Sequence, residues 1–336
     1  MRGITPLSGG AALGEASRMR KYHHLAASYV PALGIVAISI AVQPLSSFAI
    51  GNVATQTMLF IALAAIPAYR TGRMSYVDVA WPWGLVAIGL QVPVYAARFG
   101  PASAAITAAY LAIGLRMGIP GLVYLARYRG LKGEFARYRY QRIRWEAVGW
   151  RGERVPMQLE IFVQALANMS VLAVPALLVA ADPDQRLELF QVIALVVWLR
   201  SWTLEWLADQ QKRQYAAHAK RTATCEVGMW RYSRHPNYFF QWVGWVALAA
   251  AAAPALVRLG QVTSATQTWT LALALVAAPA FMLWTLFHLT GIKPAEHYSV
   301  QKRPGYGEYQ RTTNRFVPGP RRRHGERVNI RHLARA

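Results

Sequence analysis

Long apolar stretches separated by basic segments constrain the fold of this chain more than any other feature. A helix that crosses the hydrocarbon core of a bilayer needs about 20 mainly apolar residues. Stretches that meet this requirement occur at residues 26–48, 102–126, 159–181, 187–207, 237–257 and 268–290, and shorter ones occur near 55–69 and 80–97. The pattern predicts an all-α, polytopic transmembrane helical bundle with about 7–8 spans.

The composition supports this interpretation. The chain has 336 residues, of which 54% are hydrophobic, yet its formal net charge is +22. The two values are compatible when the apolar residues lie in lipid and the charges lie in loops. Nucleic acid is an unsuitable partner, because long apolar runs separate the basic clusters. The single cysteine, Cys225, excludes a disulfide framework, and no H-x-x-x-H pair suggests a metal site.

The distribution of Lys and Arg predicts the orientation of the spans. Cytosolic loops of membrane proteins carry an excess of these residues. With eight spans, every dense basic cluster, including the one at 127–154, falls on one side. We therefore expect cytosolic N- and C-termini in a bacterial inner membrane. The alternative role for 127–154 and the tail is contact with anionic lipid headgroups.

The ends of the chain differ from its centre. Residues 1–24 contain no continuous apolar segment of the kind found in a signal peptide, and they are expected to be a disordered polar N-terminus. Residues 25–320 form the expected transmembrane domain. Residues 321–336 form a basic C-terminal tail.

One face of the predicted sixth span combines aromatic and charged residues. Spacings of 4, 3, 4 and 3 place five residues on this face: Trp198, Trp202, Glu205, Asp209 and Lys212. A carboxylate near the membrane boundary is unfavourable unless it is paired or faces a wet cavity. The alternative is an ion-pair ladder of Glu205, Asp209 and Lys212, but the sequence favours a polar ligand pocket.

The segment from Trp230 to Tyr238 leads from a basic loop into the next span. Pro236 suits the first turn of a helix, where its missing N–H is not needed. The free amides of that turn attract anions. Because Arg231, Arg234 and His235 directly precede the turn, the segment is a predicted phosphate site.

Polar and aromatic residues continue along one face of that span. They are Asn237, Tyr238, Gln241 and Trp245. An amide can pair with polar groups of a ligand, and an indole offers a stacking surface. The alternative is an interfacial belt of aromatic residues with snorkelling arginines.

Several of these motifs occur together in one known family. The motifs are Ser75–Trp81, Glu205–Lys212, Gly228–Tyr238, Thr290–Glu296 and Arg303–Pro318. In order and spacing they resemble the bacterial branch of the steroid 5α-reductase family, over roughly residues 70–320. That branch is largely of unknown function. The Arg234–Tyr238 segment is more distantly similar to isoprenylcysteine carboxyl methyltransferases, which bind S-adenosylmethionine.

The resemblance implies an NADPH site in the cytosolic loops and C-terminal helices, over about residues 187–320. Asn237 and Trp245 match positions that contact the dinucleotide, and Gln241 replaces a Glu of the family pattern. The implied cofactor-binding residues are Glu205, Asp209, Lys212, Arg231, Arg234, His235, Asn237, Tyr238, Gln241, Trp245, Glu296 and Tyr309.

The implied activity is reduction of an enone or C=C bond in a lipid-like or steroid-like molecule, with hydride transferred to the β-carbon. Asp78 or Tyr76 is the candidate acid, and the alternative for Asp78 is an ion pair with Arg73 or Arg116. Ile113 stands where the family's catalytic Tyr is expected. The alternative functions are an S-adenosylmethionine-dependent membrane methyltransferase and a non-catalytic lipid-binding protein.

Overall fold

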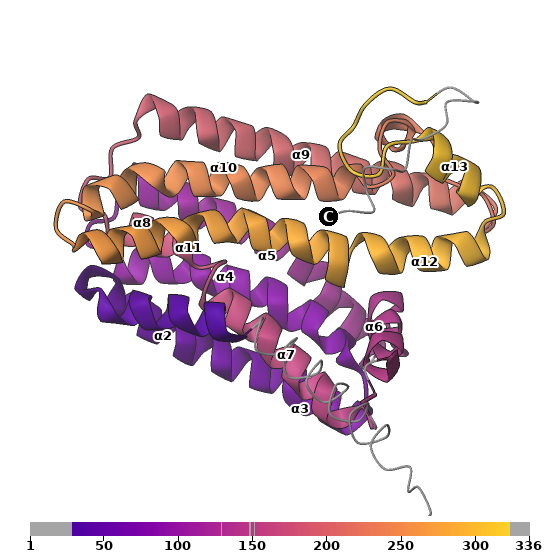
Figure 1. Cartoon of the computed structure of the whole chain (residues 1–336), viewed down its shortest axis with the longest axis horizontal. Coiled ribbons are helices and arrows are strands. Elements are labelled where there is room, and N and C mark those ends of the chain that lie inside the picture. The colour runs from indigo at the N-terminus through magenta and orange to yellow at the C-terminus, as the bar shows by residue number, and fades with distance from the viewer. Residues whose placement is uncertain (1–28, 129, 148, 151, 323–336) are drawn as a thin grey trace, which may run out of the picture. The chain divides into compact units, whose positions relative to one another are not determined.

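The computed structural model describes residues 29–128, 130–147, 149–150 and 152–322. In this part of the chain the regular structure is helical, and the only extended pairing is one isolated bridge between Ser233 and Asn314 (Figure 1). The predicted all-α fold is confirmed. The predicted polar N-terminus and all but the first two residues of the predicted basic tail lie outside the described residues.

Six helical segments of the described chain are long and apolar enough to cross a membrane. They are Gln43–Thr71, Met74–Tyr95, Pro101–Arg127, Arg154–Ala181, Pro236–Leu259 and Ala265–Lys302. A shorter apolar helix covers Tyr29–Ala41. The chain is therefore a polytopic integral membrane protein.

Two predicted spans differ from the observed helices. The stretch 26–48 is divided at Val42, which is extended, and a new helix begins at Gln43 with Pro44 in its first turn. Pro44 has no N–H to donate to the carbonyl four residues earlier, so the preceding helix cannot continue through it. The stretch 187–207 lies in α9 (Leu189–His218), which is not among the six apolar segments.

The helices form two compact units. The first unit runs to Leu195 and includes Val246–Met282, and the second consists of Val196–Trp245 and the chain from Leu283 onward. Three helices contribute to both units, namely α9, α10 (Pro236–Leu259) and α11 (Ala265–Trp284). The predicted cofactor half, 187–320, is thus shared between the units.

The first unit consists mainly of apolar helices. Besides its parts of α9, α10 and α11, it contains α2 (Gln43–Phe60), the π-helical η1 (Ile61–Ala65), α3 (Ile66–Thr71), the 3-10 turn η2 (Met74–Tyr76), α4 (Val77–Tyr95), α5 (Pro101–Tyr128), α6 (Ala136–Ala147), α7 (Arg154–Met169) and α8 (Val174–Ala181). Helices α4 and α5 approach closely at Gly114. A Cβ atom there would lie 2.6 Å from Val86 Cγ2 and 2.7 Å from the Pro82 carbonyl. Small residues permit such close approaches between membrane helices.

A buried amide network joins α2, α4 and α7. Gln56 Nε2 donates to the Gly84 carbonyl at 2.9 Å and to Asn52 Oδ1 at 3.1 Å. Asn52 Nδ2 donates to the Asn168 carbonyl at 3.0 Å. All three amide side chains are fully buried. Because unpaired polar groups are costly in an apolar bundle, this network fixes the three helices against one another.

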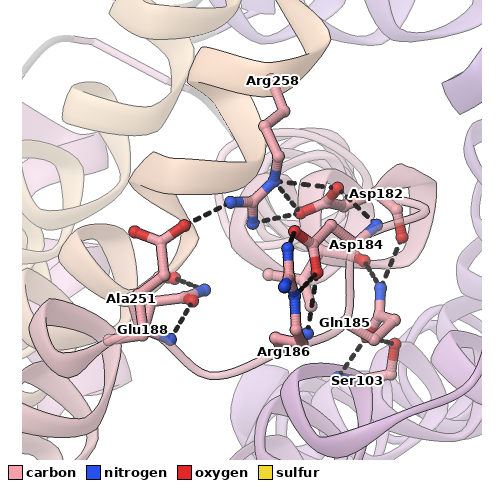
Figure 2. Close-up of polar contacts among 10 residues, drawn as sticks. Ser103, Asp182, Asp184, Gln185, Arg186, Glu188, Ala251 and Arg258 are labelled. Carbon is pink, nitrogen blue, oxygen red and sulfur yellow. Dashed lines mark hydrogen bonds and ion pairs between the residues drawn. The ribbon is translucent and has the colours of Figure 1, made fainter.

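A second polar cluster links α10 to the loop after α8 (Figure 2). Arg258 Nε donates to Asp182 Oδ2 at 2.9 Å, and its Nη2 donates to the same oxygen at 2.5 Å. Its Nη1 donates to Glu188 at 2.5 Å. In the same loop, Asp184 pairs with the exposed Arg186. The Asp182 side chain is only 3% exposed, and Arg258 is the cation that pairs with it.

We expect Asp182→Asn to lower the free energy of unfolding by about 2 kcal/mol, since it weakens hydrogen bonds to a charged group inside the protein. The measurement is denaturation of the purified chain in detergent. Asp184→Asn is the matched control in the same loop, and it should change stability little because its partner is exposed. Equal effects of the two variants would contradict a structural role for the Arg258 cluster.

The second unit surrounds the loop between α9 and α10. It contains the ends of these helices, the 3-10 turn η3 (Gly228–Arg231), the π-helical η4 (Thr285–Leu289), α12 (Ile292–Lys302) and α13 (Tyr306–Thr312). Gly228 has a φ of +55°, and a Cβ atom there would lie 2.4 Å from Gln211 Oε1. That oxygen accepts a hydrogen bond from the Met229 amide at 2.9 Å. The turn is thereby held against α9.

Candidate functional site

The second unit contains a cavity of about 300 Å³. It lies between the end of α9, the loop that follows, and helices α12 and α13. The residues around it combine basic and aromatic side chains: Lys212, Tyr215, Ala216, Ala219, Lys220, Arg221, Ala223, Thr224, Cys225, Trp230, Arg234, His235, Ala295, Ser299, Lys302, Arg303, Tyr306 and Tyr309. Six of these residues are Lys or Arg, and none is Asp or Glu. Such a lining favours an anionic ligand.

Lys212 occupies a special position in this lining. Its Nζ lies 3.9 Å from the centre of the Trp230 ring, and the ring is fixed by a 2.8 Å hydrogen bond from its Nε1 to the Ala208 carbonyl. Among the described residues, none accepts a hydrogen bond from Nζ. Desolvation lowers the pKa of Lys212 to about 8, and the nearby Arg303 acts in the same direction. The Trp230 ring face stabilises the ammonium, and an anionic ligand would add a counter-charge to it.

Two further groups in the lining lack hydrogen-bond partners. Arg303 Nη1 donates to Ser299 Oγ at 2.8 Å, whereas its Nε is buried and has no partner. Thr224 Oγ1 is also buried without a partner. Buried polar groups in native proteins are nearly always paired. A ligand that brings acceptor oxygens into the cavity would pair both groups.

Arg234 is already engaged by protein atoms. Its Nε donates to Glu296 Oε1 at 2.7 Å, and its Nη1 donates to the carbonyls of Gln310 and Thr313, each at 2.8 Å. The side chain is only 9% exposed. The sequence predicted that Arg234 meets a phosphate, but in the structure its main contacts hold α12 and α13 in place.

His235 shares the same carboxylate. Its Nε2 lies 3.2 Å from Glu296 Oε1, and because a carboxylate only accepts, this nitrogen carries the proton. Burial lowers the pKa of His235 to about 4, so the ring is neutral near pH 7. It stacks on Tyr238 with 5.4 Å between ring centres. His235 therefore contributes no positive charge to the cavity.

Of the five residues on the predicted face of α9, only Lys212 lines the cavity. Asn237 Nδ2 donates to Asp209 Oδ1 at 3.0 Å, while Asn237 Oδ1 is buried without a partner. Trp198 and Trp202 are stacked, and Glu205 is buried. No described ion pair joins Lys212 to Glu205 or Asp209, so the alternative ladder is not formed at Lys212.

Other predicted cofactor residues stand apart from the cavity lining. Helix α10 begins at Pro236 as predicted. Arg231 is exposed, Gln241 is half-buried and Trp245 is only 2% exposed, and none of the three lines the cavity. Of the twelve implied cofactor residues, those that line it are Lys212, Arg234, His235 and Tyr309.

Comparison with protein families finds a match over most of the chain. Residues 63–313 match the family described as "Protein of unknown function (DUF1295)", which covers about three quarters of the chain. The chain belongs to the DUF1295 family. The matched region includes the whole cavity of this DUF1295 protein and also Asp78. No curated protein and no solved structure matches the chain.

The candidate acids, Asp78 and Tyr76, lie in the first unit of this DUF1295 chain. Asp78 Oδ1 accepts a hydrogen bond from Tyr138 at 2.5 Å, and Oδ2 pairs with Arg137. The alternative prediction, an ion pair of Asp78 with Arg73 or Arg116, was therefore wrong. Arg73 donates to the Leu131 carbonyl instead. Helix α6, which the span pattern did not predict, supplies both observed partners.

Sequence reasoning missed much of the cavity. Trp230 stood inside the quoted motif but had no assigned role, and Thr224 carried no signal. Arg303 and Tyr306 belong to the last quoted motif, whose spacing could have identified them. Among the described residues, no group of three or more His, Cys, Asp or Glu side chains could hold a metal ion.

Proposed function

We propose that this DUF1295 protein is a membrane-embedded, NADPH-dependent reductase of an enone or C=C bond in a lipid-like or steroid-like substrate. The observation that carries the proposal is the cavity lined by six basic side chains and no carboxylate. Phosphate groups suit such a lining. S-adenosylmethionine has a positive sulfonium and no phosphate, so this lining disfavours it. The motif resemblance to steroid 5α-reductases supports the same proposal.

The available donors fit a phosphate-bearing cofactor. Arg303 Nε and Thr224 Oγ1 are buried without partners, and Lys212 has no acceptor among the described residues. The volume of about 300 Å³ lies at the lower end of ligand sites, so the cavity suits the phosphate-bearing part. When bound, the cofactor supplies a hydride. The residues of the cavity bind the anionic groups of the cofactor, and the Trp230 ring forms one side of the cavity.

The cofactor supplies only a hydride, so another group has to supply the proton that completes the reduction. Both oxygens of Asp78 are already engaged, Oδ1 by Tyr138 and Oδ2 by Arg137, so this carboxylate is not available to a substrate. Of the two candidates from the sequence, we therefore favour the Tyr76 hydroxyl. Asp78 and Arg137 then serve to hold α6 at the start of α4, next to Tyr76.

The proposal also places the cavity at the cytosolic side of a bacterial inner membrane, where NADPH is available. The support is the excess of Lys and Arg in the segments that carry the cavity. On the same basis we propose that both termini are cytosolic.

The direct test is a thermal-shift comparison of NADPH, NADH and S-adenosylmethionine on the purified chain in detergent. A ligand present at 100 times its Kd stabilises by about 2.7 kcal/mol. We expect the largest stabilisation with NADPH, less with NADH and none with S-adenosylmethionine. Stabilisation by S-adenosylmethionine alone would overturn the reductase proposal in favour of a methyltransferase. A response to none of the three would favour a non-catalytic lipid-binding protein.

A further inference from the structure

We infer that Lys212 is a covalent carbonyl-binding site, at which its amine condenses with the aldehyde of a ligand that also carries a phosphate. The inference rests on the proposed function only in that both place phosphate in the same cavity. The resemblance and the family match assign Lys212 no covalent chemistry.

The position of the Lys212 amine carries the first part of the inference. Nζ lies 3.9 Å from the Trp230 ring centre and lines a cavity that can admit a small ligand. Among the described residues no acceptor holds its hydrogens, so no ion pair has to be broken before it reacts. Lys212 is also exposed, so a ligand can reach the amine, and the contact with the Trp230 ring defines the position of the amine.

The electrostatic environment supports the same conclusion. A lysine becomes nucleophilic when desolvation or a neighbouring cation favours its neutral form. Close packing around the amine and the nearby Arg303 lower the pKa of Lys212 to about 8, while part of the side chain stays exposed. Compared with an ordinary lysine, a larger fraction of this amine is therefore neutral at pH 7.5.

The rest of the lining specifies the second part of the ligand. A plain aldehyde would gain nothing from the basic residues, whereas a phosphate pairs with them. Arg303 Nε and Thr224 Oγ1 have unfulfilled hydrogen-bonding capacity in the same cavity. A phosphorylated aldehyde small enough for about 300 Å³ therefore fits the site in both shape and charge.

The reaction needs no oxidant or reductant. The Nζ lone pair attacks the carbonyl carbon and forms a C–N bond. The two amine protons and the carbonyl oxygen then leave as one water molecule, and a C=N bond remains. The neighbouring basic side chains bind the phosphate group of the ligand. They take no part in forming or breaking bonds.

The test uses pyridoxal 5′-phosphate and, in parallel, pyridoxal on the full chain in detergent, followed by borohydride reduction and peptide mass spectrometry. Labelling of Lys132, which lies in the first unit outside the cavity, normalises the two aldehydes. With the phosphate form at pH 7.5, we expect labelling at Lys212 to be at least about tenfold faster than at Lys132. With pyridoxal this preference should be much smaller.

Two variants keep the inference falsifiable. Lys212→Arg retains the charge and should abolish the label at that position, and Arg303→Gln should reduce the preference for the phosphate form. Labelling of all lysines in proportion to exposure, or equal preference with both aldehydes, would overturn the inference.

Competition with NADPH separates the inference from the proposed function. Preferential labelling of Lys212 that NADPH does not slow would support the covalent site and contradict the NADPH proposal. Stabilisation by NADPH without preferential labelling would refute the covalent site alone.

Discussion

Replacing Glu296 with alanine is expected to lower the free energy of unfolding by about 3–5 kcal/mol, because the change leaves a buried guanidinium without its counter-charge. Glu296 accepts from Arg234 Nε at 2.7 Å and from Gln310 Nε2 at 3.0 Å, and it also contacts His235. The side chains of Arg234 and Glu296 are 9% and 13% exposed. The measurement is chemical denaturation in detergent.

The matched control for this prediction is Glu308→Gln. Glu308 also pairs with an arginine, Arg311, but that pair lies at the surface of α13. Its loss should change stability by less than about 0.5 kcal/mol. Glu296→Gln should fall between the two, since an amide still accepts from Arg234. If Glu296→Ala were no more destabilising than the control, Glu296 would not be the central contact of the second unit.

The second large effect concerns the cavity. Replacing Lys212 and Arg303 together with methionine is expected to weaken NADPH binding at least about 100-fold, because each charge-assisted hydrogen bond contributes about 1.5–3 kcal/mol. The measurement is equilibrium titration by NADPH fluorescence. Arg231→Gln is the control, since this exposed residue does not line the cavity, and it should change affinity less than about twofold.

The same titration has an expected pH dependence. In the free protein the pKa of Lys212 is lowered to about 8, so its charge is present below that pH and is lost as the pH rises through it. The affinity of the native chain should therefore fall between about pH 7 and 9. Lys212→Met should remove this dependence. A dependence that persists in Lys212→Met would assign the titration to another group.

The sequence was most informative where local pattern determines structure. Apolar length identified most of the membrane helices but wrongly added 187–207, and Pro236 marked the first residue of α10 because proline fits a helix start. The spacing along α9 also placed Asp209 and Lys212 on the side that faces Asn237 and Trp230. Each of these inferences needs only a few neighbouring residues.

The sequence was least informative where the partner is distant in the chain. Arg234 meets Glu296, which lies 62 residues away, and Asp78 meets Tyr138, which lies 60 residues away. No local pattern indicates which carboxylate an arginine will meet. Arg234 is therefore the type of residue expected to bind a phosphate, although its contacts in the structure fix the fold around the cavity.

The most direct test of the central claim is hydrogen exchange of the purified chain with and without NADPH, analysed peptide by peptide. The claim is that the basic cavity of the second unit binds the phosphates of NADPH. We expect NADPH to slow exchange in the loop at 219–227 and in α12 and α13, which surround the cavity. No protection in these segments at saturating NADPH, or protection confined to other parts of the chain, would contradict the claim.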